Sequence, residues 1–422
     1  MQVSNQTVII VGAGVIGCAT AYLLARHGFA VTVIEIEPGP GLITSYANGA
    51  QLSYSHVEPL ASPATLKKLP SLLIDPQSPL RFRVTGEWEQ MVWGFKFIRA
   101  CTQAHVKFAT KALLGLSFLS RDELVAAIER DQLSFDYSQP GKLVIYNSPE
   151  AIQAAKKQME FQRTLGCQQM LLSTHECLER EPALTNYQSH MAGGVWTPGE
   201  AVGDAKKLCD DLVQHSRKMG AKFLYLSRVK NFIVQGDRIQ AAILESGERL
   251  MADYFVLANG NGAAGLGKKL GLSLPVYPLK GYSLSFTLKE FAKAPQISVT
   301  DFRRKIVYAS LGNKLRVAGM AELVGYDWSL SEKKLQFLKQ STEETFPGAC
   351  DFHADTTPWV GLRPVTPTSL PIIGPARFTN FLLNVGHGSL GFTLALGSAR
   401  LIVDYLNNRS NPIMQQAFGL KP

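Results

Sequence analysis

The sequence predicts an α/β fold made of two structural units. An apolar, strand-like run at 7–11 ends in a glycine-rich motif at 12–17, and an apolar helical run and a second strand at 30–34 follow. Further short, strand-like segments recur later in the chain, several of them separated by polar turns. At 422 residues the chain is longer than one typical domain. We therefore expect a Rossmann-like α/β domain joined to an α+β unit with a mainly antiparallel sheet.

The glycine motif predicts what the first unit binds. Gly12 allows a tight turn off the strand, Gly14 lets a pyrophosphate approach the backbone, and Gly17 lets the helix pack closely on the sheet. Glu35 ends the second strand, where a carboxylate can accept hydrogen bonds from a ribose diol. A glycine-rich turn that binds nothing would not require a strand, three glycines, a helix, a second strand and an acidic residue in this order. An acidic residue at position 35 also argues against a cofactor with a 2′-phosphate. We predict an ADP-containing dinucleotide.

Composition favours a cytoplasmic protein with a substantial core. Hydrophobic residues make up 46% of the chain and charged residues 18%. No apolar run reaches the length of about 18 residues that a membrane-spanning helix requires. The six cysteines include no C-x-x-C pair, which favours free thiols over disulfides or a metal site. The first strand begins so early that no signal peptide is expected.

The positive charge of the chain has several interpretations. A net charge of +9 suits nucleic acid, an anionic membrane or an anionic substrate. No dense run of Lys and Arg and no nucleic-acid motif occurs, so we expect no nucleic-acid partner. The segment 66–118 mixes basic residues with Trp88, Trp93 and Phe95 at helical spacing. It is either an amphipathic helix that covers the core or a peripheral contact with the inner face of the cell membrane.

The remaining elements follow in order along the chain. Residues 63–120 are mostly helical, 141–146 form a strand, 149–165 form an amphipathic helix, and Asp204 caps the next helix. Strands are predicted at 223–229, 231–235, 239–244, 254–257, 275–286, 306–310, 314–319 and 381–385, and turn-rich segments at 361–367 and 371–374.

These elements divide between the two units in an interrupted pattern. We expect the dinucleotide-binding domain at 1–80, 148–272 and 356–422. The substrate-binding domain is expected at 81–147 and 273–355.

Three motifs in this order resemble those of a known family. They are the glycine motif with Glu35, Ala258-Asn259-Gly260 at a strand end, and the C-terminal stretch 386–393, Gly-His-Gly-Ser-Leu-Gly-Phe-Thr. Together they resemble the D-amino-acid oxidase-type family of FAD-dependent oxidoreductases. Within that family the chain is most similar to the small-subunit type of bacterial D-amino acid dehydrogenase. The stretches that carry this closer resemblance are 44–51, 277–284, 316–322 and 361–367.

The resemblance implies that FAD is bound non-covalently in an extended pose. Glu35 would bind the adenosine ribose, and the backbone of Val229 would contact adenine. The segment 388–393 would bring a helix N-terminus to the flavin pyrimidine edge, where it stabilises the negative charge of reduced flavin. The implied cofactor-binding residues are Gly12, Gly14, Val15, Ile16, Gly17, Glu35, Ser45, Asn48, Val229, Gly260, Gly388, Leu390, Gly391 and Thr393.

The resemblance also implies two catalytic residues. Arg363 would bind a substrate carboxylate as a bidentate, charge-assisted pair, although a core Asp or a backbone carbonyl could instead be its partner. Tyr282 would cap that carboxylate or form a wall of the side-chain pocket, unless it is simply a half-buried strand residue, which is the simpler interpretation of Tyr308. His387 as a general base is a weaker hypothesis, because its glycine neighbours favour a backbone role.

The activity implied is oxidative deamination of D-amino acids to 2-oxo acids and ammonia. Hydride would pass to the flavin, and electrons would then pass to a quinone or respiratory carrier. Two alternatives stay open. One is oxidation of a secondary or small amine (D-proline, a hydroxyproline isomer, glycine or sarcosine), because 49–51 and 53–56 depart from the family pattern. The other is an FAD-binding subunit of a multi-subunit dehydrogenase.

Overall fold

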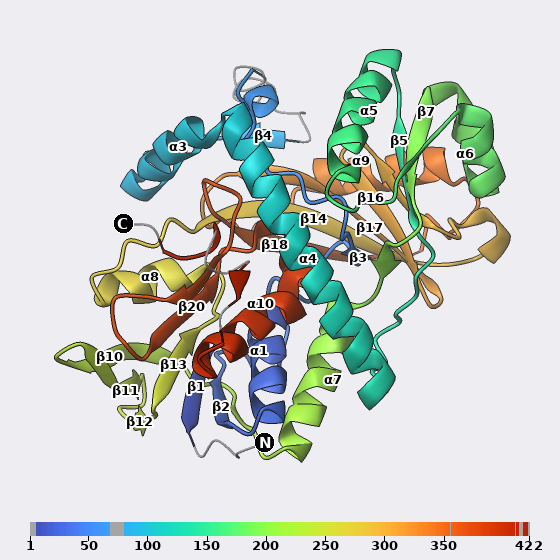
Figure 1. Ribbon diagram of the computed structural model, residues 1–422. Coiled ribbons are helices and arrows are strands. Elements are labelled where there is room, and N and C mark those ends of the chain that lie inside the picture. Colours follow the sequence, from blue (N-terminus) through green and yellow to red (C-terminus); the bar gives the residue numbers. More distant parts are fainter. Residues whose placement is uncertain (1–5, 68–79, 355, 410, 413–416, 421–422) are drawn as a thin grey trace.

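The computed structural model describes residues 6–67, 80–354, 356–409, 411–412 and 417–420, and it confirms the predicted fold class (Figure 1). Two sheets organise the chain. One has six strands and is largely parallel, and the other has nine strands and is mainly antiparallel. In Figure 1 the first lies in the lower part of the molecule and the second in the upper part.

The six-stranded sheet forms the dinucleotide-binding unit. Its strand order is β19 (Ile372–Pro375), β20 (Phe381–Val385), β13 (Tyr254–Leu257), β1 (Thr7–Val11), β2 (Ala30–Ile34) and β9 (Lys222–Leu224). β19 runs antiparallel to β20, and the other neighbours are parallel. β1 is buried on both faces, because Val8 and Ile10 pack in one hydrophobic core and Ile9 and Val11 in another. A parallel strand covered on both sides reads as such a continuous apolar run.

Different elements cover the two faces of this sheet. The helices α1 (Val15–Arg26), α7 (Ala205–Lys218) and α10 (Gly391–Leu406) share the first core. The second core includes residues of the three-stranded sheet β10 (Val229–Gln235), β11 (Arg238–Leu244) and β12 (Arg249–Met251), and of α8 (Gly262–Lys269).

A long helix, α4 (Gln103–Asp131), crosses α10 at close range. A Cβ atom on Gly397 would lie only 2.7 Å from the carbonyl oxygen of Leu116. Among the described residues, Gly388–Leu406 is long and apolar enough to cross a membrane, but 72% of it is buried inside the fold. α10 is apolar because it is packed between α4 and the six-stranded sheet.

The nine-stranded sheet forms the second unit. Along the sheet the order is β18 (Thr357–Val365), β14 (Tyr277–Thr287), β17 (Lys314–Leu323), β16 (Ile306–Leu311), β15 (Ser298–Asp301), β5 (Lys142–Tyr146), β7 (Gly193–Thr197) and β6 (Met170–Leu172), with β4 (Leu80–Phe82) paired to β17. The helical segments that accompany it are α5 (Pro149–Arg163), α6 (Thr174–Arg180), η1 (Pro182–His190), η2 (Phe291–Lys293) and α9 (Glu332–Thr345). Two short strands, β3 (Gln51–Leu52) and β8 (Ala201–Val202), form a separate antiparallel pair.

The structure corrects the prediction that 361–367 and 371–374 are turn-rich. These residues lie mostly in β18 and β19. β18 is at the edge of its sheet, where a proline such as Pro364 is tolerated because an edge strand need not donate every N–H group. Gly361 and Pro364 are typical of turns, but here both belong to a strand.

The division into domains stays a proposal, and sheet membership differs from the predicted ranges. β6 and β7, from 148–272, and β18, from 356–422, are hydrogen-bonded within the nine-stranded sheet. Conversely, α4 contributes to the core of α1 and α10. The chain thus crosses between the two units more often than the predicted ranges indicate.

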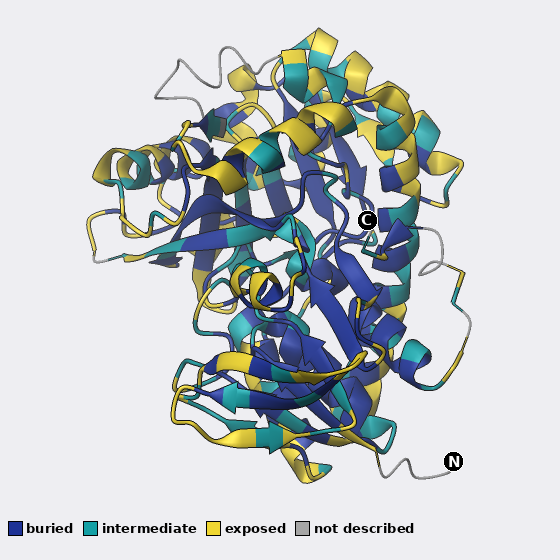
Figure 2. Cartoon of the chain, turned by 90° about the vertical axis from the view of Figure 1, so that its left-hand side faces the viewer, coloured by how far each residue is buried: buried dark blue, intermediate teal, exposed yellow. Residues whose placement is uncertain are grey.

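The basic, aromatic segment 66–118 forms two faces rather than one, apart from 68–79, which lie outside the described residues. In α3 (Trp88–Ala100), Trp93 and Phe97 are buried, and the indole of Trp93 donates a hydrogen bond to the carbonyl of Val365 at 3.1 Å. Trp93 therefore fits the first of the two interpretations, an amphipathic helix that covers the core. The other face of α3 exposes Trp88, Met91, Phe95 and Ile98. α3 lies on the left-hand side of the molecule in Figure 1, which is the side that faces the viewer in Figure 2.

Candidate active site

A cavity of about 990 Å³ brings most of the predicted site residues together. One wall comes from the six-stranded sheet, its glycine motif and the segment 384–393, and another from β14, β17 and β18. The predicted residues that line it are Gly12, Gly14, Val15, Ile16, Glu35, Ser45, Asn48, Val229, Gly260, Tyr282, Arg363, Gly388, Leu390, Gly391 and Thr393.

The glycine motif has the geometry of a diphosphate cradle. Gly12 has a φ of +103°, and a Cβ atom there would lie 2.7 Å from Cα of Asn259. Gly17 does not line the cavity, but a Cβ atom on it would lie 1.9 Å from the carbonyl oxygen of Gly12. By contrast, a Cβ atom on Gly14 would have no protein atom nearer than Ser45 Oγ at 3.6 Å. Gly12 and Gly17 thus serve packing, and Gly14 keeps the cavity open.

Glu35 is fixed beside this cradle by backbone groups. Its carboxylate accepts hydrogen bonds from the N–H of Ala13 at 2.5 Å and of Glu37 at 2.9 Å. Its own carbonyl accepts from the N–H of Ser227, two residues before Val229. The end of β2 and the start of β10 therefore lie together, as binding of an adenosine group requires.

The cavity wall also carries unsatisfied polar groups. Within the described residues, Asn259 Oδ1, Asn384 Oδ1 and His387 Nε2 are buried without a hydrogen-bond partner, and all three residues line the cavity. The N-terminus of α10 lies at the same wall, and Thr393 Oγ1 accepts a hydrogen bond from the N–H of Ser53 at 3.0 Å. Buried polar atoms are normally paired, so these groups fit a polar cofactor with both donors and acceptors.

Arg363 lies at the cavity with no acidic partner among the described residues. Its Nη1 donates to the carbonyl of Met320 at 2.9 Å, and a Cβ atom on Gly281 would come within 2.3 Å of its Nη2. Burial lowers the pKa of Arg363 to about 10, so the guanidinium is charged at neutral pH, and no carboxylate of the described chain contributes to that shift. A buried cation without a counter-charge is costly, and an anionic ligand would offset this cost.

A bulge in β17 provides the acceptor for Arg363. The pairing of β14 with β17 shifts between Lys280 and Tyr282, and Met320 has a φ of +66°. A bulge re-aims backbone groups, and here it accompanies a carbonyl directed at the guanidinium. The guanidinium is thereby held in place while it remains on the cavity wall.

Tyr282 has its hydroxyl group engaged by the protein. The hydroxyl donates to Glu322 Oε2 at 2.8 Å, and burial together with this carboxylate raises the pKa of Tyr282. Glu322 is in turn paired with Lys334. This arrangement favours Tyr282 as a cavity wall rather than as a cap on a carboxylate. Tyr308 packs in the core of the second unit and does not line the cavity.

His387 is neutral over the physiological range. Burial lowers its pKa from 6.5 to about 3. Between these values the unfolded chain binds a proton that the folded chain does not, so the free energy of unfolding falls as pH decreases below about 6.5.

His387→Gln should reduce this loss of stability at low pH by about 1.4 kcal/mol per pH unit. Urea unfolding of the apo-protein at pH 6.5 and pH 5 measures it; equal losses in both proteins would contradict the assignment.

Sequence reasoning missed Trp359. A Cβ atom on Gly361 would lie 2.0 Å from its indole, and Trp359 lines the cavity. Gly361 pairs directly with Gly281, over which the Arg363 guanidinium lies. The signal was present, because both glycines fall within stretches that carry the family resemblance. Two paired glycines make room for an indole and a guanidinium on one wall.

The fold and the cavity define a dinucleotide-binding protein. The family model described as FAD dependent oxidoreductase matches residues 7–405, and the chain belongs to this family. FAD is therefore its cofactor. The glycine cradle, the unpaired polar atoms of Asn259, Asn384 and His387, and the N-terminus of α10 fit this cofactor.

Comparisons with individual proteins agree with this family. The chain is 42% identical to a D-amino acid dehydrogenase 2 of Ralstonia nicotianae, over 98% of this chain and 99% of that protein. It is 40% identical to a D-amino acid dehydrogenase 2 of Pseudomonas aeruginosa, over 99% and 98%. The structure of glycine oxidase from Geobacillus kaustophilus superposes with a TM-score of 0.75 at 22% identity, covering 97% of this chain and 96% of that one. That likeness concerns the fold alone.

Proposed function

We propose that this protein oxidises D-amino acids to imino acids, which water hydrolyses to 2-oxo acids and ammonia. The observation that carries the proposal is Arg363, a buried guanidinium on the cavity wall without an acidic partner among the described residues. Planar, bidentate recognition of a carboxylate is the task for which Arg is best suited. The names of the relatives at 40–42% identity support the choice of D-amino acids.

The residues of the chain bind and orient the substrate in this proposal. FAD, when bound, supplies the acceptor for the hydride that leaves the α-carbon. Arg363 holds the α-carboxylate, and Tyr282 and Trp359 exclude water from one side. The N-terminus of α10 stabilises negative charge at the adjoining wall. With its pKa lowered to about 3 by burial, His387 is a weak base, and the Tyr282 hydroxyl is already bonded to Glu322. In this proposal the amine therefore loses its proton to solvent, without a dedicated base.

An anaerobic titration tests this proposal. The visible spectrum of the purified holoenzyme is recorded with D-alanine, L-alanine, D-proline and glycine in turn. Bleaching by D-alanine and not by its L-isomer is the expected result. Bleaching by proline or glycine alone would instead support a secondary or small amine as substrate. A flavin spectrum that no amine changes would support an FAD-binding subunit that needs a partner.

We further propose that electrons leave to a quinone at the inner face of the cell membrane, with α3 as the peripheral contact. The exposed fractions along one face of α3 are 71% for Trp88, 56% for Met91, 63% for Phe95 and 47% for Ile98. Lys96 and Arg99 are exposed on the same helix. An apolar stripe beside basic side chains suits an anionic lipid surface.

Vesicle binding tests the role of α3. Replacing Phe95 and Ile98 with serine should weaken binding to anionic phospholipid vesicles at least about 30-fold, because two inserted apolar side chains each contribute about 1 kcal/mol or more. Cosedimentation measures the change. Met251→Ser is the matched control, since Met251 is 75% exposed on β12. Equal binding by all three proteins would exclude α3 as the contact.

A further inference from the structure

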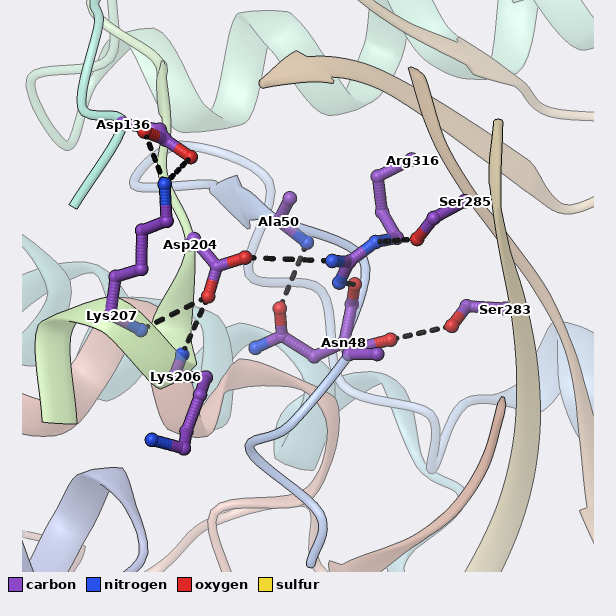
Figure 3. Close-up of polar contacts among 10 residues, drawn as sticks. Asn48, Ala50, Asp136, Asp204, Lys206, Lys207, Ser283, Ser285 and Arg316 are labelled. Carbon is purple, nitrogen blue, oxygen red and sulfur yellow. Dashed lines mark hydrogen bonds and ion pairs between the residues drawn. The ribbon is translucent and has the colours of Figure 1, made fainter. Parts of the chain in front are cut away.

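Arg316 joins three parts of the molecule (Figure 3). It lies on β17 and is buried, with an exposed fraction of 8%. Its Nε donates to Ser285 Oγ on β14 at 2.8 Å, and its Nη1 donates to the carbonyl of Asn48 at 3.0 Å. Its Nη2 lies 3.5 Å from Asp204 Oδ2. A single guanidinium thus connects the nine-stranded sheet, the loop 44–51 and the start of α7.

Asp204 has two tasks in this arrangement. Its Oδ1 accepts hydrogen bonds from the N–H groups of Lys206 and Lys207, at 2.9 and 3.1 Å, and so caps α7. Its Oδ2 faces Arg316. The sequence pattern predicts only the first task. The second connects α7, which packs in the dinucleotide-binding unit, to the sheet that carries Arg363.

The loop held by Arg316 has an uncommon conformation. Ala50 has a φ of +58°, a region that residues other than glycine rarely adopt. Asn48 Oδ1 accepts from the N–H of Ala50 at 2.9 Å, the N–H of Gly203 donates to the carbonyl of Ala50 at 2.9 Å, and Ser283 Oγ donates to the carbonyl of Ala47 at 2.6 Å. Such conformations persist where surrounding contacts fix them.

The other surface of the same loop lines the cavity. Asn48, Gly49, Ala50 and Gln51 are wall residues, whereas Arg316 is not. A Cβ atom on Gly49 would lie 3.0 Å from Val307 and 3.7 Å from Cβ of Ala318, so this loop is packed directly on the nine-stranded sheet. A displacement of the Asn48 carbonyl would therefore change the shape of the cofactor cavity.

We propose that Arg316 and Asp204 form a clasp that positions the loop 44–51 against FAD. Arg316 touches neither cofactor nor substrate and acts through the backbone of Asn48. The clasp also sets the distance between the unit that holds FAD and the sheet that holds the substrate carboxylate. This role does not depend on which amino acid the enzyme oxidises.

Three variants separate the contacts of the clasp. Arg316→Met keeps an unbranched, apolar stem that reaches as far as the ε position and removes all three contacts. Asp204→Asn removes the charge facing Arg316 but keeps an oxygen that caps α7, because Asn caps helices as well as Asp does. Ser285→Ala removes a single hydrogen bond. Arg304→Met is the matched control, since Arg304 lies beside the same sheet and pairs with Glu344 at 2.5 Å, away from the loop.

The readouts are the dissociation constant of FAD for the apo-protein and the visible spectrum of the bound flavin. Arg316→Met should weaken FAD binding at least about tenfold, the equivalent of about 1.4 kcal/mol, and shift the flavin bands. Its kcat should fall with little change in KM, because Arg363 is intact. Asp204→Asn should show smaller changes in the same direction, and Arg304→Met should show none. Arg316→Lys should recover only part of the loss, because lysine lacks the planar fork.

Wild-type FAD affinity and spectrum in Arg316→Met would overturn the proposal. If that variant does not fold, as judged by its near-ultraviolet circular dichroism, Asp204→Asn decides the question, because its helix cap is intact. An unchanged dissociation constant and spectrum in Asp204→Asn would then overturn the clasp. Changes as large in Arg304→Met would also overturn it, since they would show a general effect of losing a paired arginine.

Discussion

Replacing Arg363 with lysine should lower kcat/KM for a D-amino acid by about 5- to 150-fold, or ~1–3 kcal/mol of transition-state binding. Lysine keeps the positive charge but loses the planar pair of donors that a carboxylate accepts, and it cannot also retain the hydrogen bond to Met320 with the same geometry. Steady-state kinetics with an artificial electron acceptor measure the effect. Arg363→Met, without the charge, should lose about a further tenfold.

Two controls distinguish loss of carboxylate binding from general damage. FAD content per chain should be unchanged, because Arg363 contacts the cavity from β18 rather than from the glycine cradle. A primary amine without a carboxylate should react equally slowly with the wild-type protein and with both variants. If kcat/KM for the amino acid were unchanged in Arg363→Lys, Arg363 would not belong to the site and the proposed substrate class would lose its main support.

The dinucleotide-binding half was predictable because its signals are local. The strand, the three glycines and Glu35 lie within the first 35 residues, and the structure places them at one end of β1 and β2 as expected. The motif is legible within one short stretch of sequence, although Gly12 also packs against the distant Asn259. The same holds for Asp204 as a helix cap, which depends on Lys206 and Lys207.

The second half was harder, because its features depend on residues far apart in the sequence. Arg363 was selected by resemblance, yet its strand was interpreted as a turn, since Gly361 and Pro364 are turn formers unless the pairing with β14 is known. The role of Trp93 was left open between the core and a membrane surface, because helical spacing does not reveal which face of a helix is buried. The contacts of Arg316 with Asn48 and Asp204 span more than one unit, and no local pattern indicates them.

Gly14→Ala should produce a folded protein that has largely lost FAD. The new methyl group would meet no protein atom nearer than 3.6 Å, and φ at this position is −67°, which alanine adopts without strain. The apo-protein should therefore lose no more than about 1 kcal/mol of stability, chiefly through a poorer helix cap. The methyl group projects into the cradle, however, so FAD should bind about 5- to 150-fold more weakly, by overpacking of about 1–3 kcal/mol. Titration of apo-protein with FAD measures this.

Gly17→Ala is the complementary variant, because its damage should fall on the fold. Its Cβ atom would lie 1.9 Å from the carbonyl oxygen of Gly12, so α1 and β1 would have to separate. Urea unfolding of the apo-protein should show a loss of about 3 kcal/mol or more, with loss of FAD as a consequence. A Gly14→Ala protein that binds FAD as tightly as the wild type would mean that the diphosphate does not approach the backbone at Gly14. Stability losses of equal size in the two variants would mean that Gly14, too, serves packing rather than the cofactor.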